Sequence, residues 1–369
     1  MKRFQLNNLT PDQYKSLLCR PGEPAQVDDA VRRICLDVKT RGDEAVRDYA
    51  VQYDSALLDN FEVTDHELVK AEEALPERLR SAILESIASL HAFHKTQGQV
   101  EAAVETLNGV RCWRERRPVN SVGFYIPAGS APLPSTVLML GIPAKIAGCP
   151  NITLCSPARR DGSVDPTVLA AATMLGISNV YRIGGAQAIA AMAYGTESIP
   201  KVDKIFGPGN RYVTAAKRFV SADPDGVAID MLAGPSELLI IADDHADPSI
   251  VATDLLSQAE HDPDSQVVLV TTSSKVAESV LVQLNDQMDG LPRREILLRS
   301  LASSFILEVA TIDEAIEFSN DYAPEHLIIN TRNPESLVSR IQNAGSVFLG
   351  AYAPVTAGDY ASGTNHTLP

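Results

Sequence analysis

The chain has 369 residues, of which 45% are hydrophobic and 21% are charged. This length allows two domains of roughly 100–200 residues each, and the composition excludes global disorder and a disulfide-stapled miniprotein. A net charge of −15, from 32 basic and 47 acidic residues, disfavours nucleic acid and anionic membranes as main partners. The start MKRFQLNNLT lacks a signal-peptide core, and no apolar stretch approaches the roughly 20 residues that span a bilayer. The five cysteines form no C-x-x-C pair, so we expect a cytoplasmic protein without disulfides.

The first hundred residues are expected to be helical. Thr10-Pro11 is a helix cap followed by a first-turn proline, and apolar residues recur at helical spacing from about Asp28 and from about Pro76 to His94. His91 and His94 have i, i+3 spacing, but we interpret them as ordinary helix-surface histidines rather than metal ligands.

From Val110 onward, short apolar runs alternate with capped helices, which predicts largely parallel sheets flanked by helices. The expected strands are 151–155, 179–183, 204–206, 227–229, 238–242, 266–271, 326–330 and 346–349. The expected helices are 165–176, one from Asp247, one from Thr311, and 333–345. Two such sheets are expected to meet near Gly234-Pro235, and the last nineteen residues, from Ala351, are expected to form an irregular loop.

Glycine- and proline-rich turns follow several of these strands, at 125–129 (YIPAG), 184–187 (GGAQ) and 207–210 (GPGN). In an open α/β sheet such turns line the ligand crevice, and the amides of a helix N-terminus suit phosphate. Because no G-x-G-x-x-G follows a strand, tight turns that bind nothing are an equally good interpretation.

Three further groups of residues suit metal binding or proton transfer. Gln258 and His261 share one face at the end of a helix and suit a cation, although a histidine facing the helix dipole is the plainer alternative. Glu325 and His326 precede an apolar strand and form a proton-transfer pair only if they lie on the turn at its mouth, the alternative being a solvated strand end. The terminal loop 358–366 offers a carboxylate and an imidazole between glycines, or is a frayed terminus.

Together these segments resemble the histidinol dehydrogenase family, whose members are NAD-dependent, zinc-containing enzymes of histidine biosynthesis. The resemblance runs in collinear order through VGFYIPAGSAPLPSTVLML, GGAQAIAA, KVDKIFGPGNRYVTAAK, AIDMLAGPSE, DLLSQAEHDPDSQV, APEHLIIN, AGSVFLG and AGDYASGTNH. It covers essentially the whole chain.

The resemblance implies an activity, two cofactors and a set of site residues. The activity is the two-step oxidation of L-histidinol, through L-histidinaldehyde, to L-histidine by a homodimer. The residues implied to contact NAD are Tyr125, Gln187 and Asn210, and those implied to bind zinc are Gln258, His261 and Asp359. The substrate site would be lined by Ser236, His326, His366 and the zinc ligands Gln258, His261 and Asp359, with Glu325 and His326 as the catalytic acid–base pair.

The resemblance also implies the fold: two incomplete Rossmann-like α/β domains with parallel-rich sheets, similar in topology to aldehyde dehydrogenases. We expect an N-terminal helical arm at 1–25 and a nucleotide-binding domain at 128–235. Residues 26–127 and 236–369 would form a larger α/β domain that carries the metal and catalytic residues.

Family members usually continue into a small helical C-terminal domain, which supplies a further zinc histidine and an acidic substrate contact. The given sequence stops before it, so two interpretations are open. The segment is missing from the given sequence, which we favour because every retained site position keeps a suitable residue, or the chain is a truncated NAD-binding homologue that acts as a dimer partner. A rival enzyme class, the metal-free aldehyde dehydrogenases, would need a reactive cysteine, whereas Cys149 and Cys155 lie in apolar segments expected to be buried.

Overall fold

The computed structural model describes residues 1–20, 27–98, 101–128, 132–232, 236–365 and 367. The chain divides into two compact units. Unit 1 combines residues 1–23 with 234–359, and unit 2 consists of residues 24–233 and 360–368. Among the described residues, no helix is both long enough and apolar enough to cross a membrane.

Unit 1 is built on a parallel six-stranded sheet with the order β1-β11-β10-β9-β12-β13. The strands are β1 (Lys2–Gln5), β9 (Glu237–Ala242), β10 (Gln266–Thr271), β11 (Phe305–Glu308), β12 (His326–Asn330) and β13 (Ser346–Leu349). The chain moves from β9 to β10 and β11 on one side, and then returns to β12 on the other side of β9. The order of the strands therefore reverses between β9 and β12.

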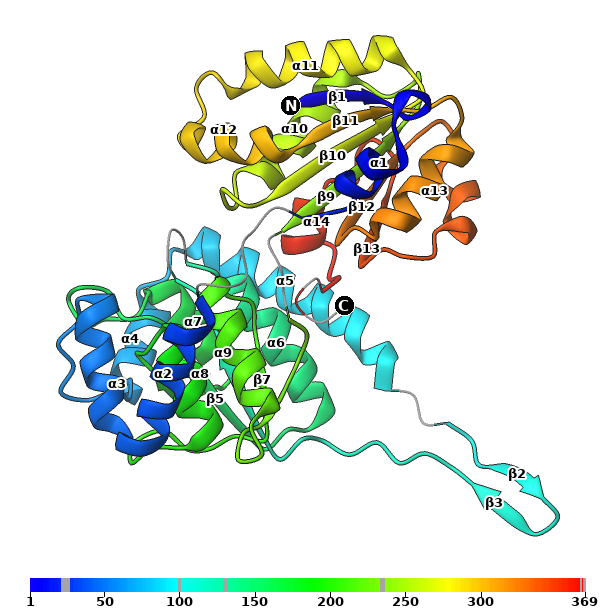
Figure 1. Cartoon of the computed structure of the whole chain (residues 1–369). Helices are drawn as coiled ribbons and strands as arrows, with labels where there is room; N and C mark the ends of the chain where they lie inside the picture. The colour runs from blue at the N-terminus through cyan, green and yellow to red at the C-terminus, as the bar shows by residue number, and fades with distance from the viewer. Residues whose placement is uncertain (21–26, 99–100, 129–131, 233–235, 366, 368–369) are drawn as a thin grey trace. The chain divides into compact units, whose positions relative to one another are not determined.

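Helices cover both faces of this sheet, as Figure 1 shows. On one face lie α10 (Pro248–Ala259), α11 (Ser274–Met288) and α12 (Arg294–Ser303), and on the other lie α1 (Pro11–Leu17) and α13 (Ile312–Tyr322). Alternate residues of β9 divide between these layers, with Leu238 and Ile240 on the first face and Leu239 and Ile241 on the second. A strand that is buried on both faces is apolar throughout, which is why the central strands are visible in the sequence as continuous runs.

Unit 2 contains a parallel five-stranded sheet of order β6-β5-β4-β7-β8, together with an antiparallel hairpin. The sheet strands are β4 (Ser121–Tyr125), β5 (Asn151–Cys155), β6 (Asn179–Tyr181), β7 (Lys204–Phe206) and β8 (Ala228–Ile229), and the hairpin strands are β2 (Val104–Leu107) and β3 (Val110–Cys112). The chain crosses from β6 back to β7 on the other side of β4. The switch point of this sheet therefore lies between β4 and β7.

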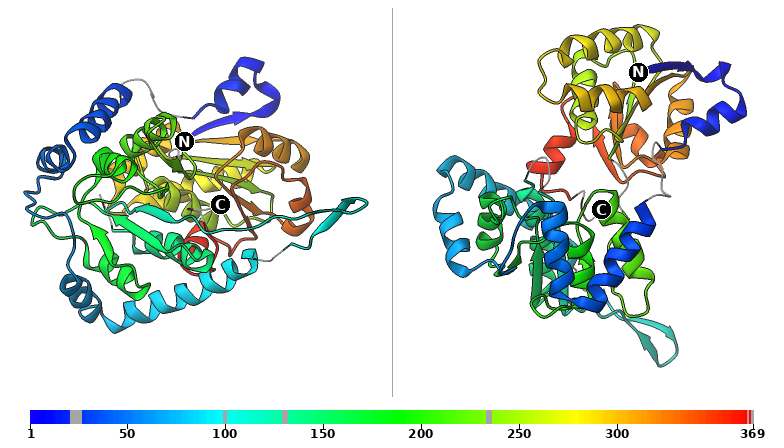
Figure 2. Two further views of the ribbon diagram at one scale, coloured as in Figure 1. Left: turned by 90° about the horizontal axis from the view of Figure 1, so that it is seen from below. Right: turned by 60° about the vertical axis from the view of Figure 1, so that its left-hand side comes forward.

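Two layers of helices enclose the five-stranded sheet (Figure 2). The first layer is α2 (Val27–Arg41), α3 (Asp43–Tyr49), α8 (Gly185–Tyr194) and α9 (Arg211–Ala222). The second layer is α4 (Asp65–Glu73), α5 (Glu77–Lys95), α6 (Pro134–Ala147) and α7 (Pro166–Met174). Helix α7 begins where the sequence offers a cap: the Asp165 side chain accepts from the Thr167 amide, with Pro166 in the first turn.

The units confirm the expected α/β class with parallel-rich sheets, but they differ from the expected domain boundaries. Residues 1–25 are not simply a helical arm, because β1 extends the sheet of unit 1 by pairing with β11. Residues 27–98 and 101–127 group with unit 2, not unit 1, because α2 packs on α8 and α9 while α4 and α5 pack on α7 and α6. The expected junction at Gly234-Pro235 lies outside the described residues.

Two local expectations near the C-terminus are also wrong. The segment expected as a helix over 333–345 is a 3₁₀ helix, η4 (Pro334–Arg340), in which only Pro334 is buried. A segment without an apolar stripe gains little from packing, so a long α-helix is not favoured there. The segment expected as an irregular loop contains α14 (Val355–Tyr360), in which Val355 and Asp359 are buried.

Candidate active site

The amino-terminal edge of the unit 1 sheet collects most of the candidate residues. Ser236 precedes β9, while Glu325 and His326 stand at the start of β12. Helix α10 returns from the carboxyl end of β9 to the amino end of β10, so its last turn, with Gln258, reaches the same edge. Residues that are far apart in sequence are thereby brought to one edge of one unit.

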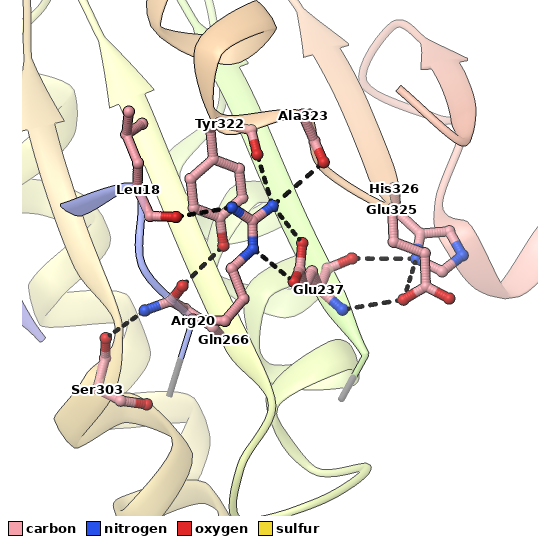
Figure 3. A network of polar contacts seen from close by, with 9 residues as sticks. All are labelled: Leu18, Arg20, Glu237, Gln266, Ser303, Tyr322, Ala323, Glu325 and His326. Atoms are coloured by element: carbon pink, nitrogen blue, oxygen red, sulfur yellow. Dashed lines mark hydrogen bonds and ion pairs between the residues drawn. The ribbon is translucent and has the colours of Figure 1, made fainter. Parts of the chain in front are cut away.

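The acid–imidazole pair is held by the backbone of Glu237, the first residue of β9 (Figure 3). The Glu237 amide donates to Oε2 of Glu325 at 3.1 Å, and its carbonyl lies 3.0 Å from Nδ1 of His326. The same Nδ1 is 3.5 Å from Oε2 of Glu325. His326 is only 4% exposed, so the solvated strand end considered above is wrong for this residue.

This arrangement fixes the tautomer of His326. A carbonyl oxygen and a carboxylate oxygen both face Nδ1, and both can only accept a hydrogen bond. Nδ1 therefore carries the proton of the neutral ring, and Nε2 is the basic nitrogen. The pair thus offers one proton acceptor at Nε2 and a second at the carboxylate of Glu325.

The candidate metal ligands belong to the same unit. Gln258 is buried in the last turn of α10, His261 follows that turn, and the Asp359 carboxylate is buried on α14. Desolvation lowers the pKa of His261, although the residue as a whole is exposed. The charges of Asp359 and Glu260 act in the opposite direction. A lowered pKa keeps the imidazole neutral, which is the form that binds a metal.

The donor set suits a borderline divalent cation such as zinc. It comprises one neutral imidazole, one carboxamide oxygen and one carboxylate. The charge of Asp359 acts on His261, so these two residues interact although they are far apart in the sequence. By their chemistry, these three donors are compatible with the metal that the family resemblance implies.

The candidate nucleotide residues lie in unit 2, at the carboxyl ends of its strands. Tyr125 ends β4, and its hydroxyl accepts a hydrogen bond from the Gly185 amide at 3.1 Å. Asn210 caps α9, which follows β7, and its Oδ1 accepts from the Tyr212 and Val213 amides at 3.0 and 3.2 Å. Because β4 and β7 flank the switch point, both residues stand where open α/β sheets bind their ligands.

Gly207 allows the turn after β7 to pass close to Tyr125. Its φ is +127°, and a Cβ there would lie 2.2 Å from the Tyr125 carbonyl oxygen. The buried Lys217 ammonium holds the same turn, since it donates to the Gly207 carbonyl at 2.9 Å and forms an ion pair with Asp230. The 207–210 turn is therefore a built structure that glycine makes possible.

Gln187 is buried on α8, and sequence analysis missed its neighbour Asp54. Nε2 of Gln187 lies 3.5 Å from Oδ2 of Asp54, which ends the π-helical turn η2 (Ala50–Asp54). Burial raises the pKa of Asp54 to about 6. No sequence signal marks Asp54, because it comes from a segment without strand or motif character.

The terminal segment carries a second cluster that sequence analysis missed. His94 is buried and is not the surface residue that was expected. Its Nδ1 lies 2.8 Å from Oε1 of Gln97, and its Nε2 lies 3.1 Å from Nδ2 of Asn365. Asn365 also donates to the Met139 carbonyl. The segment is thus anchored through Asn365 and is not a frayed end at this point. His366 lies outside the described residues.

Neither Cys149 nor Cys155 has the properties of a reactive thiol. Cys155 is fully buried on β5, and burial raises its pKa. Cys149 is only partly buried, which differs from the expectation, and this partial burial still raises its pKa. A thiol with a raised pKa is a poor nucleophile near neutral pH, so neither cysteine fits the requirement of the rival enzyme class.

A family model for histidinol dehydrogenase matches residues 20–369. The chain belongs to the histidinol dehydrogenase family. The enzyme of that name from Xanthomonas axonopodis pv. citri is 51% identical over 371 aligned positions, which cover 100% of this chain and 86% of the relative. The Bacteroides thetaiotaomicron histidinol dehydrogenase is 52% identical, over 97% of this chain and 83% of the relative.

Solved structures agree with this assignment. The crystal structure of histidinol dehydrogenase from Elizabethkingia anophelis superimposes with a TM-score of 0.95 at 48% identity, covering 100% of this chain and 84% of the other. A benzaldehyde dehydrogenase from Corynebacterium glutamicum has a TM-score of 0.50 at 11% identity, over 92% of this chain and 84% of the other, and shows a shared fold alone. The family and the aldehyde dehydrogenase-like topology expected from the sequence are confirmed. The alternative of a non-catalytic homologue is not favoured.

Proposed function

We propose that the chain oxidises L-histidinol to L-histidine in two steps, with NAD as the oxidant and zinc as the ion that holds the substrate. The observation that carries the proposal is the Glu325–His326 pair, with Nδ1 of His326 fixed as a donor on the Glu237 carbonyl. The donor set of Gln258, His261 and Asp359 supports the metal, and the switch-point residues Tyr125 and Asn210 support the nucleotide.

In the first oxidation, Nε2 of His326 takes the hydroxyl proton of L-histidinol while a hydride leaves the carbon that bears this hydroxyl. The alcohol loses two electrons and two hydrogens and becomes an aldehyde. Imidazole suits this step because it exchanges protons near neutral pH. The hydrogen bond from Nδ1 to the Glu237 carbonyl stabilises the ring as it becomes positively charged.

The second oxidation needs a water molecule, and Glu325 is placed to activate it. Its carboxylate takes a proton from water as the water oxygen bonds to the aldehyde carbon, and this proton then passes to the former aldehyde oxygen to give a gem-diol. His326, having returned its first proton to solvent, then takes a hydroxyl proton as a second hydride leaves. Over both steps the substrate loses two hydrides, one water is consumed, three protons are released and a carboxylate is formed.

The two cofactors supply chemistry that side chains lack. NAD, when bound, accepts one hydride in each oxidation. Zinc, when bound through Gln258, His261 and Asp359, orients the substrate by its ring and amine. Ser236 and His366 complete the proposed substrate contacts, and Gln187 completes those to the nucleotide.

The proposal extends to assembly and location. We propose that the protein is a cytoplasmic homodimer that acts on a small molecule, with neither nucleic acid nor membrane as a partner. The homodimer comes from the family resemblance alone, while the net charge of −15 is unfavourable for polyanionic partners.

Measuring the stoichiometry of the reaction tests the proposal. Purified protein is incubated with zinc, limiting L-histidinol and excess NAD, and NADH is followed by absorbance. Two NADH and one L-histidine per L-histidinol are expected. No NADH, or one NADH with the aldehyde as the final product, would overturn the two-step function.

A further inference from the structure

Arg20 makes an unusually complete set of contacts near the end of the N-terminal segment of unit 1 (Figure 3). Its Nε and Nη2 bind the two carboxylate oxygens of Glu237 at 2.7 and 2.9 Å. Nη1 donates to the Leu18 carbonyl at 2.9 Å, and the guanidinium carbon lies 3.9 Å from the centre of the Tyr322 ring. This part of the chain has no chemistry assigned to it.

The carboxylate that Arg20 holds belongs to the residue whose backbone holds the acid–imidazole pair. Glu237 uses its side chain for Arg20, its amide for Glu325 and its carbonyl for His326. A displacement of Glu237 would therefore move the acceptor that fixes the proton on Nδ1 of His326. It would also move the donor that orients the Glu325 carboxylate.

Arg20 also binds the segment that leads into the pair. Nη2 donates to the carbonyls of Tyr322 and Ala323 at 2.5 and 3.1 Å. Ala323 ends α13 with a φ of +52°, a conformation that costs energy for a residue with a Cβ. A guanidinium that binds this carbonyl helps to hold the strained turn from which Pro324, Glu325 and β12 follow.

We propose that Arg20 is a positioning residue for the Glu325–His326 pair, acting through Glu237 and through the turn at Ala323. The inference rests on the proposed function for the role of the pair, although the positioning itself can be measured without turnover. The Arg20 guanidinium binds both Glu237 and the turn at Ala323, and the position of the pair depends on both. Arginine suits this task because its planar fork binds a carboxylate through two nitrogens and still has donors for carbonyls, which a lysine ammonium cannot reproduce.

The tautomer of His326 gives a test that does not depend on activity. The full zinc-loaded chain is labelled with ¹⁵N-histidine, and the His326 signal is assigned by its loss in His326→Asn. The parent is expected to show Nδ1 protonated and Nε2 unprotonated in the neutral ring. Arg20→Ala is expected to populate both tautomers, and a His326 that keeps the parent tautomer in Arg20→Ala would overturn the inference.

A matched control separates positioning from general stability. Arg3 is a second N-terminal arginine that binds a glutamate on the same sheet, Glu308, through Nε and Nη2. Arg3→Ala removes a comparable ion pair on β11, away from β9 and β12. It is expected to leave both the His326 tautomer and kcat at their parent values. A change in His326 as large as that in Arg20→Ala would show a general effect of lost ion pairs and overturn the inference.

Kinetics supply the second arm. Arg20→Ala is expected to lower kcat by about 100-fold, the scale of a misplaced catalytic group, with KM for NAD unchanged because the nucleotide residues lie in unit 2. Arg20→Lys keeps the positive charge but lacks the planar guanidinium, and it is expected to recover part of the lost kcat. This variant also allows the test if Arg20→Ala does not fold.

A double-mutant cycle tests the route through Glu237. Glu237→Ala is expected to lower kcat about as much as Arg20→Ala does. The double variant is expected to lose little more activity than the less active single variant, because both substitutions remove the same Arg20–Glu237 ion pair. Losses that multiply would overturn the route through Glu237. A parent chain that forms no NADH would count against the proposed function. In that case the His326 tautomer in Arg20→Ala still tests the positioning role of Arg20.

Discussion

The buried carboxyl of Asp254 should lower the folding stability of unit 1 by a measurable amount. It lies on α10, one turn before Gln258, and is 7% exposed. Burial raises the pKa of this carboxyl from 3.8 to about 6. A raised pKa means that the folded state binds the proton more tightly than the unfolded state does. This tighter binding stabilises the fold fully below pH 3.8, and the stabilisation is lost as the pH rises through about 6. Asp254→Asn is neutral at every pH and should remove the penalty.

The magnitude follows from the size of the shift. A rise of roughly 2.2 pKa units corresponds to about 3 kcal/mol at 1.36 kcal/mol per unit. Asp254→Asn is therefore expected to stabilise unit 1 by about 3 kcal/mol at pH 7.5. At pH 4.5, where the folded-state carboxyl is already protonated, the gain should fall to about 1 kcal/mol.

Native-state hydrogen exchange of the metal-free protein is the suitable assay, because amides of β9, α10 and β10 report on unit 1 alone. A global melting curve would mix two units. Asp286→Asn, an exposed substitution on the neighbouring helix α11, is the control and should change exchange little at either pH. Equal protection of Asp254→Asn and the parent at pH 7.5, or a gain as large at pH 4.5 as at pH 7.5, would refute the reasoning.

Two more substitutions test other parts of the structure. Lys217→Met leaves Asp230 as a buried charge without its cation, so we expect unit 2 to lose about 3–5 kcal/mol by hydrogen exchange of β7 and α9. Adding Asp230→Asn should recover part of this loss, and no recovery would contradict the pairing. Cys155→Ala should keep the parent rate of aldehyde oxidation, measured as NADH formation from supplied L-histidinaldehyde, because its thiol is buried and its pKa is raised; abolished turnover would implicate a cysteine nucleophile.

Much of the fold was predictable because the central strands are buried on both faces. The bounds expected for 151–155, 266–271 and 326–330 agree with β5, β10 and β12. Each of these strands has a largely apolar run at its centre, which a sequence shows directly. By contrast, β1 has the sequence KRFQ and is largely exposed, and only its pairing with β11 makes it a strand.

The site was only partly predictable, for a similar reason. The short constellations Gln258–His261 and Glu325–His326 are visible as neighbours in sequence, whereas Asp359 entered only through the family resemblance. Arg20 meets Glu237 across more than two hundred positions, and such a contact leaves no periodic or spacing signal. The grouping of residues 27–98 and 101–127 with unit 2 likewise depends on helix packing that composition does not encode.

The division of labour between Glu325 and His326 is tested most directly by counting NADH per L-histidinol in two variants. Glu325→Gln keeps an oxygen that can accept from the Glu237 amide, and His326→Asn keeps a nitrogen that can donate to its carbonyl, so both should fold. The glutamine variant is expected to stop near one NADH with L-histidinaldehyde accumulated, and the asparagine variant to form almost none, against two for the parent. A glutamine variant that forms L-histidine at the parent rate, or an asparagine variant that oxidises the alcohol normally, would contradict the account.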